Sequence, residues 1–184
     1  MKKKNLEVII NHKIGPFNKT IRVDPDKSLS IRSFLIGSIC QGKSIARNIL
    51  ESEDVKSTIL ACRKLGVKIE KIKPKNYKIY GKGLGSFSIK KNSELNFGNS
   101  GTASRLLIGI LSTTPNIQVK LKGDNSLNKR SMKKLINLME KFGVTFFPNN
   151  KFTFPLKMIS SKMPIGINYK TDVSAQLKSA VILA

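Results

Sequence analysis

Three segments of this chain join small polar residues to a single cation and then turn apolar, a combination suited to binding anions. They read SLSIRSFLIGSI from Ser28, GTASRLLIGILS from Gly101 and SAQLKSAVILA from Ser174. Serine and glycine are typical of helix starts, where the first backbone amides have no partner within the helix. Those amides and the helix dipole attract negative charge. Three such starts brought together would form a cleft for a multiply charged anion.

The spacing of these segments indicates an internal repeat. Ser28 and Gly101 are 73 residues apart, and so are Gly101 and Ser174. The same shift aligns one cation in each copy, namely Arg32, Arg105 and Lys178. An equal interval with aligned cations predicts copies of one structural unit.

The elements that position these residues follow from the hydrophobic pattern. A second amphipathic helix, 54–65 in one copy and 132–142 in the next, ends before a glycine and an alternating strand. Turn signals at 81–83 and 148–150 separate further strand-like segments. These segments are 5–10, 78–80, 87–89, 117–121 and 152–154. The unit therefore reads as helix, strand, helix and then short strands.

The composition favours a folded chain with a large positive charge. Of its 184 residues 40% are apolar, and the apolar runs are too short to cross a bilayer. No charged-then-apolar leader is evident, so we expect a cytoplasmic protein. The formal net charge of +23 suits either a nucleic acid or small polyanionic substrates. The lysines are dispersed and aromatic residues amount to only 7%, which argues against single-strand binding.

Residues that commonly hold metals or act as nucleophiles are sparse. Cys40 and Cys62 lie far apart without a nearby histidine, so we expect two reduced, half-buried thiols. The one histidine, His12, has no orienting partner nearby and is expected at the surface. The sequence therefore predicts neither a metal site nor histidine-based chemistry.

Four motifs resemble signatures of the EPSP synthase family. They are DKSLSIRSFLIGSIC from Asp26, GNSGTASRL from Gly98, GDNSLNKRSM from Gly123 and DVSAQLKSAVILA from Asp172. All four occur in family order and at family-like intervals, so the resemblance covers nearly the whole chain. The related UDP-N-acetylglucosamine enolpyruvyl transferases share the fold. They differ by a Lys-Asn pair in place of Lys27-Ser28 and by a cysteine that has no evident counterpart here.

The resemblance implies a transferase of the shikimate pathway, which leads to chorismate and the aromatic amino acids. Such an enzyme moves the enolpyruvyl group of phosphoenolpyruvate to the 5-hydroxyl of shikimate 3-phosphate and releases phosphate. The family uses addition and elimination through a tetrahedral intermediate without metal or organic cofactor, and it is the target of glyphosate. Both substrates are polyanions, which fixed cations and amides suit. The complete protein is expected to be a monomer that binds these small molecules and neither nucleic acid nor membrane.

Individual residues match the family's binding positions. Lys27 matches a catalytic lysine that contacts both substrates, and Gly101 a glycine whose backbone approaches phosphoenolpyruvate. Arg105 is left open between a substrate contact and a brace of the glycine-rich loop. The matched contacts of shikimate 3-phosphate are Lys27, Ser28, Arg32, Ser174, Ala175 and Gln176. Those of phosphoenolpyruvate are Lys27, Gly101, Arg130 and Gln176. Without the resemblance, the same residues read as helix caps, surface cations and a turn glycine.

Two positions depart from the family pattern. Asp24-Pro25 replaces the usual Pro-Gly before Asp26, and proline cannot take the positive φ that glycine can. Ser131 replaces a proline after Arg130. We therefore expect a different loop shape before Lys27 and a less rigid start of the following helix.

The implied fold is α/β, the enolpyruvyl transferase fold, in which each of two globes is built from βαβαββ units. Residues 1–22 would supply strands of the first globe, and 23–184 about two units of the second globe with the start of a third. The third copy stops within its apolar helix at Ala184, so we expect an incomplete, inactive chain whose catalytic Asp and Glu lie beyond it. A basic nucleic-acid-binding module and a non-catalytic relative of the family remain as alternatives.

Overall fold

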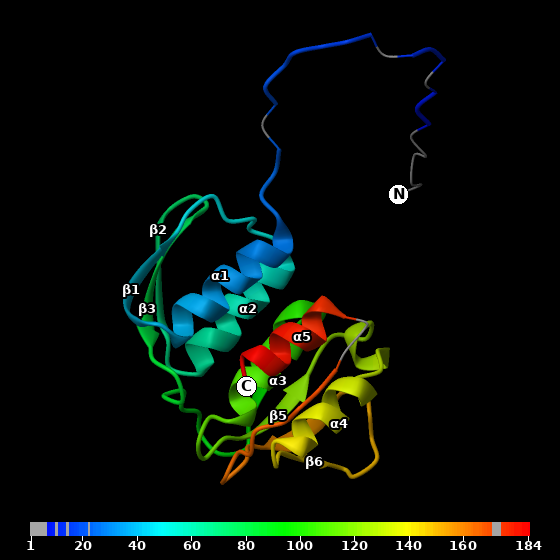
Figure 1. Ribbon diagram of the computed structural model, residues 1–184. Helices are drawn as coiled ribbons and strands as arrows, with labels where there is room; N and C mark the ends of the chain where they lie inside the picture. The colour runs from blue at the N-terminus through cyan, green and yellow to red at the C-terminus, as the bar shows by residue number, and fades with distance from the viewer. Residues whose placement is uncertain (1–6, 10, 14, 22, 171–173) are drawn as a thin grey trace.

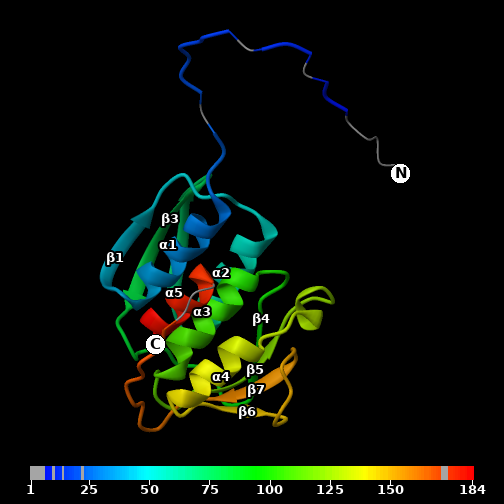
Figure 2. The same cartoon turned by 45° about the vertical axis from the view of Figure 1, so that its right-hand side comes forward.

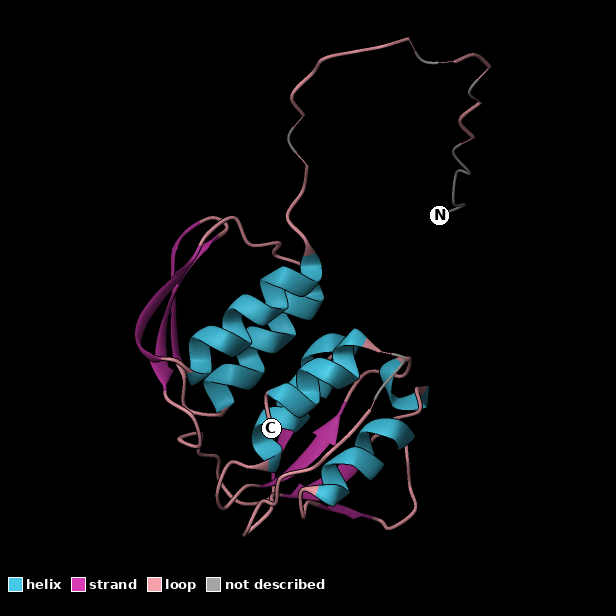
Figure 3. Ribbon diagram, viewed as in Figure 1, coloured by secondary structure: helices cyan, strands magenta, loops and turns pink. Residues whose placement is uncertain are grey.

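A computed structural model describes residues 7–9, 11–13, 15–21, 23–170 and 174–184. Most of these residues form two successive α/β units, each with helices on one face of a sheet (Figure 1; Figure 3). The first unit contains α1 (Lys27–Ile39), β1 (Gln41–Ala46), α2 (Glu53–Lys64), β2 (Lys68–Lys73) and β3 (Asn76–Lys82). The second contains β4 (Ser93–Asn96), α3 (Gly101–Ser112), β5 (Gln118–Lys122), η1 (Leu127–Lys129), α4 (Lys133–Lys141), β6 (Thr145–Phe147) and β7 (Leu156–Ile159). Helix α5 (Ala175–Ile182) follows.

The first sheet has the order β1-β3-β2, with both pairs antiparallel. Helices α1 and α2 lie side by side over one face (Figure 1). The alternation of β3 fits this arrangement, because Tyr77 and Ile79 are buried while Lys78 and Tyr80 are half-exposed. On the buried face, the ring of Phe34 from α1 meets that of Tyr77 edge-on at 5.2 Å between centroids.

The second sheet has the order β4-β5-β7-β6, in which β4 and β5 are parallel and the other neighbours are antiparallel. A parallel pair needs a crossover connection, and α3 provides it. Every residue of α3 except Arg105 is buried, and Arg105 is half-buried. Helix α3 therefore forms the centre of the molecule, with α1 and α5 packed against it (Figure 2).

The two units confirm the repeat and its order of elements. Strands β1, β3 and β2 occupy the places of β5, β7 and β6, and α1 and α2 those of α3 and α4. Helix α5 then repeats the start of α1 and α3. It approaches α3 so closely that a Cβ on Gly109 would lie 2.2 Å from the carbonyl oxygen of Ala180. Glycine is therefore required at this helix crossing.

Several expected elements differ in the structure. The five expected helices are confirmed, but 87–89 and 152–154 are irregular, and strands β1, β4 and β7 were not expected. Phe87 and Phe154 are buried from loops, which explains their strand-like apolar pattern. Of the expected strand at 5–10, residues 5, 6 and 10 lie outside the described residues, and 7–9 form no strand.

The cysteines and the histidine can now be placed. Cys40 is exposed and Cys62 is fully buried, so the expectation that both are half-buried is wrong, although both are free. Burial raises the pKa of the Cys62 thiol to about 11, which leaves it unreactive at neutral pH. His12 is exposed, as expected. No helix among the described residues has the length and apolar character needed to cross a bilayer.

Candidate functional site

The starts of α1 and α3 and the first turn of α5 face a common hollow of about 490 Å³. Its lining residues are Lys27, Ser28, Asp54, Asn99, Gly101, Thr102, Arg105, Arg130 and Gln176. The lining thus contains three cations and a single carboxylate. Helix starts and surplus cations both favour a bound anion.

The glycine-rich loop before α3 is held from both sides. Ser100 caps the helix, because its Oγ accepts from the backbone amide of Ala103 at 3.2 Å. Gly98 adopts a positive φ of 55°, and its carbonyl accepts from the amide of Asp124 at 2.8 Å. This bond joins the loop to residues 123–132, which carry Arg130 to the hollow.

Arg130 is positioned by neutral acceptors. Its Nη2 donates to Asn99 Oδ1 at 2.6 Å and to Ser126 Oγ at 3.4 Å. The turn before it is fixed by Asp124, whose Oδ1 accepts from the amide of Leu127 at 2.8 Å. Arg130 takes part in none of the ion pairs found among the described residues, so its charge is available to a ligand.

Arg105 lies beside Arg130 and joins the second repeat to the third. Its Nη1 donates to the carbonyl of Gly101 at 3.0 Å and to Gln176 Oε1 at 3.1 Å. Gln176 Nε2 in turn donates to Thr102 Oγ1 at 3.0 Å. Burial, and after it the charge of Arg130, lowers the pKa of the Arg105 guanidinium, but arginine stays charged at neutral pH. Two neighbouring cations without carboxylate partners in the described part of the chain make this wall of the hollow strongly positive.

Lys27 lines the same hollow from the start of α1. Its Nζ lies 2.9 Å from Asp54 Oδ2 in the first turn of α2. The lysine side chain is 52% exposed and that of Asp54 only 17%. The carboxylate therefore orients the ammonium group, and the exposed part of the lysine side chain remains accessible to a ligand.

Ser28 also lines the hollow, whereas Arg32 is not among its lining residues. Asp26, not Ser28, caps α1, since its Oδ1 accepts from the amide of Leu29 at 2.6 Å. The alternative interpretation of Ser28 as a helix cap is therefore wrong. Arg32 is half-buried, and its Nη1 lies 3.4 Å from the carbonyl oxygen of Ser28.

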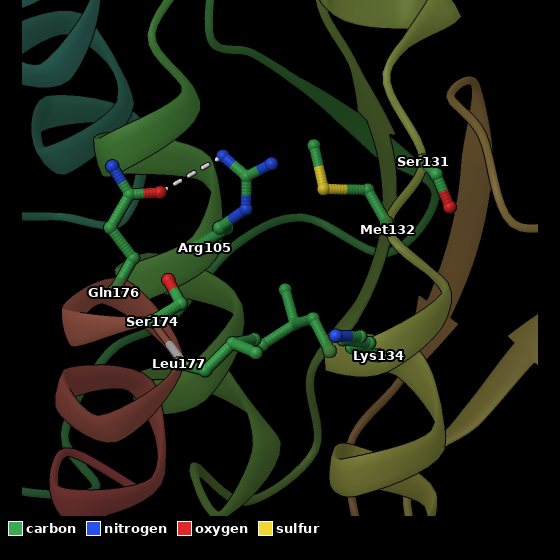
Figure 4. A pocket seen from close by; sticks show the side chains of 8 residues that line it. Arg105, Ser131, Met132, Lys134, Ser174, Gln176 and Leu177 are labelled. Atoms are coloured by element: carbon green, nitrogen blue, oxygen red, sulfur yellow. Dashed lines mark hydrogen bonds between the residues drawn. The ribbon is translucent and has the colours of Figure 1, made fainter. Parts of the chain in front are cut away.

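A second hollow of about 310 Å³ adjoins the first between α3, α4 and α5 (Figure 4). Its lining residues are Arg105, Ser131, Met132, Lys134, Leu135, Ser174, Gln176 and Leu177. Ser174 precedes α5, but its hydroxyl makes no capping bond, so this group is available to a ligand. Ala175 is exposed and lines neither hollow.

Several lining residues were not expected from the sequence. Asn99 and Thr102 lie within the glycine-rich motif and could have been suspected from it. Asp54 and Lys134 carried no such signal, because each reaches a hollow through packing between helices. No group of three or more histidine, cysteine, aspartate or glutamate side chains suited to a metal occurs among the described residues.

Comparisons with known proteins place this geometry in a family. The family described as EPSP synthase (3-phosphoshikimate 1-carboxyvinyltransferase) matches residues 11–184. The chain belongs to the EPSP synthase family. This membership confirms the resemblance of the four motifs and gives no support to the alternative of a nucleic-acid-binding module.

Individual EPSP synthases are similar to this chain over most of its length. The 3-phosphoshikimate 1-carboxyvinyltransferase of Syntrophomonas wolfei is 37% identical over 176 residues, which cover 95% of this chain and 40% of the relative. That of Alkaliphilus oremlandii is 41% identical over 182 residues, 97% of this chain and 41% of the relative. The structure of the Acinetobacter baumannii EPSP synthase matches with a TM-score of 0.80 and 35% identity over 89% of this chain and 37% of that one. This likeness confirms the α/β fold. The chain spans about 40% of the length of these relatives.

Proposed function

We propose that this chain supplies the shikimate 3-phosphate and part of the phosphoenolpyruvate site of an EPSP synthase. In this enzyme the enolpyruvyl group of phosphoenolpyruvate passes to the 5-hydroxyl of shikimate 3-phosphate with release of phosphate. The observation that carries the proposal is the pair Arg105 and Arg130 at the start of α3, held by neutral acceptors. Such a pair needs an anion with more than one charge to offset its repulsion.

Phosphoenolpyruvate is assigned to the wall formed by Gly101, Arg130 and Lys27. A Cβ on Gly101 would lie 2.7 Å from Arg105 Nη1 and 3.3 Å from Arg130 Nη1, so glycine leaves room for both guanidinium groups. Lys27 lines the same hollow, where its ammonium group can stabilise the charge of the departing phosphate. Lys27 is the catalytic residue in this assignment.

Shikimate 3-phosphate is assigned to the remaining polar groups around the two hollows. The hydroxyl of Ser174, which makes no capping bond to α5, and the amides at the start of that helix, including that of Ala175, suit its phosphate. Ser28 and Gln176 line the first hollow, and their polar side chains suit the hydroxyl groups of such a ligand. Arg32 is assigned to its carboxylate; it would reach the ligand by turning away from the carbonyl of Ser28.

The lining residues provide binding groups but little acid–base chemistry. Asp54 is the one carboxylate among them, and it is already paired with Lys27. Proton transfer to and from the tetrahedral intermediate therefore needs groups from elsewhere in the complete enzyme. We infer that this chain binds its small-molecule partners without turning them over, and that the complete enzyme acts as a monomer in the cytoplasm.

Calorimetric titration of the 184-residue chain with shikimate 3-phosphate tests the proposal. Shikimate and inorganic phosphate serve as ligand controls. Arg130→Met should weaken phosphoenolpyruvate binding, measured in the presence of shikimate 3-phosphate, roughly 10- to 100-fold, since a charge-assisted hydrogen bond contributes about 1.5–3 kcal/mol. Arg47→Met removes an equal charge at an exposed position that lines neither hollow and should change affinity little.

Three results would overturn the proposal. One is equal affinity for shikimate 3-phosphate and inorganic phosphate. Another is preferential, steeply salt-dependent binding of oligonucleotides, which would support a nucleic-acid partner. Release of phosphate from phosphoenolpyruvate by the 184-residue chain alone, in the presence of shikimate 3-phosphate, would show that the acid–base groups lie within it.

A further inference from the structure

Arg105 makes contacts that its counterpart in the first repeat does not make. Arg32 contacts only the carbonyl of Ser28 on its own helix in the described structure, at 3.4 Å. Arg105 instead reaches Gln176, 71 residues further along the chain, while also holding the carbonyl of Gly101. Arg105 and Gln176 are moreover the two residues that line both hollows (Figure 4).

These contacts fix the orientation of the Gln176 side-chain amide. Arginine has only donors, so the atom that faces Arg105 must be the amide oxygen. The amide nitrogen then points to Thr102 Oγ1, which accepts from it at 3.0 Å. Rotation of the amide by half a turn would set donors against donors at Arg105 and break this bond. The guanidinium therefore selects one of two otherwise similar amide orientations.

The planar shape of arginine matters as much as its charge. One guanidinium nitrogen spans the Gly101 carbonyl and the Gln176 amide oxygen, while the rest of the group remains along the wall between the hollows. A lysine would place a similar charge nearby and also donates from one nitrogen, but its flexible stem lacks the rigid plane that directs the two N–H groups of Nη1. Charge and geometry can therefore be separated by experiment.

We propose that Arg105 is a positioning residue that acts through Gln176 and the Gly101 carbonyl. It holds the amide and the glycine-rich loop in the arrangement that receives the substrates on both sides. This role rests on the proposed function, because it concerns the same two substrates. It assigns Arg105 to the brace of the loop and extends that brace to the third repeat.

Arg105→Lys tests whether the planar guanidinium group is needed in addition to its charge. Affinity for shikimate 3-phosphate, measured by calorimetry on the 184-residue chain, should fall about five- to tenfold, as expected for the net loss of one ordinary hydrogen bond while the charge is kept. Arg63→Lys is the matched control. Arg63 Nη2 donates to the carbonyl of Ile69 at 2.7 Å, and Arg63 lines neither of the two hollows. That control should stay within twofold of the parent chain.

Gln176→Met breaks the same link from its other end without changing any charge. If Arg105 acts through Gln176, the double variant should bind little worse than the weaker single variant. An effect equal to the product of the two single effects would show that Arg105 acts independently of Gln176. Unchanged affinity in Arg105→Lys would also overturn the proposal.

The side-chain amide signals of Gln176 in a ¹⁵N-correlated NMR spectrum give a readout that does not need substrate. Arg105→Lys should move these two signals, and Arg63→Lys should not. If the parent chain does not bind shikimate 3-phosphate, the proposed function fails, and the amide signals still decide whether Arg105 positions Gln176. Urea unfolding midpoints of all variants identify any that lose affinity through misfolding, and Gln176→Met then decides the link.

Discussion

The two repeats differ in how they are stabilised. In the second unit, β5 has a neighbour on each side and α3 is buried all round apart from Arg105. In the first unit, β1 pairs with β3 alone among the described strands, and α1 exposes Leu29 and Ile36. Both sheets carry side-chain ion pairs, such as Glu51 with Lys71 in the first unit and Glu94 with Lys122 in the second, so these pairs do not account for the difference.

The two units also hold their residues at the candidate site in different ways. The buried second unit provides a fixed wall, with Gly101, Arg105 and Arg130 tied to backbone or neutral groups. The more open first unit contributes Lys27 on a half-exposed stem. The cations of the second unit are thus held by several hydrogen bonds each, whereas Lys27 is held by one ion pair, with Asp54.

The largest expected effect compares a buried leucine of α3 with an exposed leucine of α1. Leu107 in α3 is fully buried, whereas Leu29 in α1 is 66% exposed. Leu107→Ala should lower the free energy of unfolding by about 2–5 kcal/mol, through lost burial and a residual cavity. Leu29→Ala should change it by less than about 0.5 kcal/mol. Urea unfolding measures both, and similar values would contradict the difference in burial between the helices.

The next effect compares Gly109 in α3 with Gly37 in α1. A Cβ on Gly109 would meet the backbone oxygen of Ala180 at 2.2 Å and force α3 and α5 apart. A Cβ on Gly37 would meet the flexible end of Ile79 at 2.9 Å. Gly109→Ala should therefore destabilise by roughly 1–3 kcal/mol, while Gly37→Ala should be near neutral because alanine favours the helix. Thermal or urea unfolding showing equal losses would refute the tight crossing of α3 and α5.

Gly101→Ala should change binding more than folding. The new Cβ would meet the ends of Arg105 and Arg130, which can move aside, so the fold should persist. Displacing the guanidinium groups should weaken phosphoenolpyruvate binding in the presence of shikimate 3-phosphate about fivefold, which corresponds to about 1 kcal/mol. In the complete enzyme the same change should reduce inhibition by glyphosate. Ser28→Ala, one repeat earlier, should have a smaller effect in calorimetry, and equal effects would refute the assignment of the second unit as the main wall.

The smallest effect concerns the acid sensitivity of the first unit. The hydrogen bond from Lys71 is the main cause that lowers the pKa of Glu51 to about 2, helped by those from Tyr77 and the Lys75 amide. The unfolded carboxyl titrates near pH 4.3. Its folded pKa is depressed, so the stabilisation is present above that pH and is lost as the pH falls towards 2. Glu51→Gln should therefore be less stable than the parent at pH 7, with the gap closing below pH 4. A pH-independent gap in urea unfolding would contradict this origin.

The helices could be predicted because their signals are local. Capping residues and 3.6-residue spacing mark α1 to α5 within each segment. Strand β1 was missed because its sequence, QGKSIA, is mostly polar, and pairing with β3 determines it instead. Strand β7 was displaced in the prediction by the neighbouring Phe152 and Phe154, which are apolar for reasons of burial from a loop. Short strands depend on partners that are distant in sequence.

The sequence predicted which residues line the site better than it predicted the contacts among them. The resemblance of the motifs to the family pointed to Lys27, Gly101, Arg130 and Gln176, and all four line one hollow. The contacts among them depend on how α5 rotates against α3 and how α2 lies beside α1. The pairing of Asp54 with Lys27 follows from that packing, and no short motif encodes it.

Among the described strands β1 has a neighbour on one side only, which has a consequence for the behaviour of this chain in solution. A free strand edge offers backbone donors and acceptors to another copy, and Ile45 on β1 is 51% exposed. Lys43 on the same strand and the net charge of +23 oppose such an encounter. Colloidal stability should therefore depend on charge repulsion, which salt screens over shorter distances. We expect the chain to stay dispersed in dilute buffer and to polymerise edge to edge as the ionic strength rises.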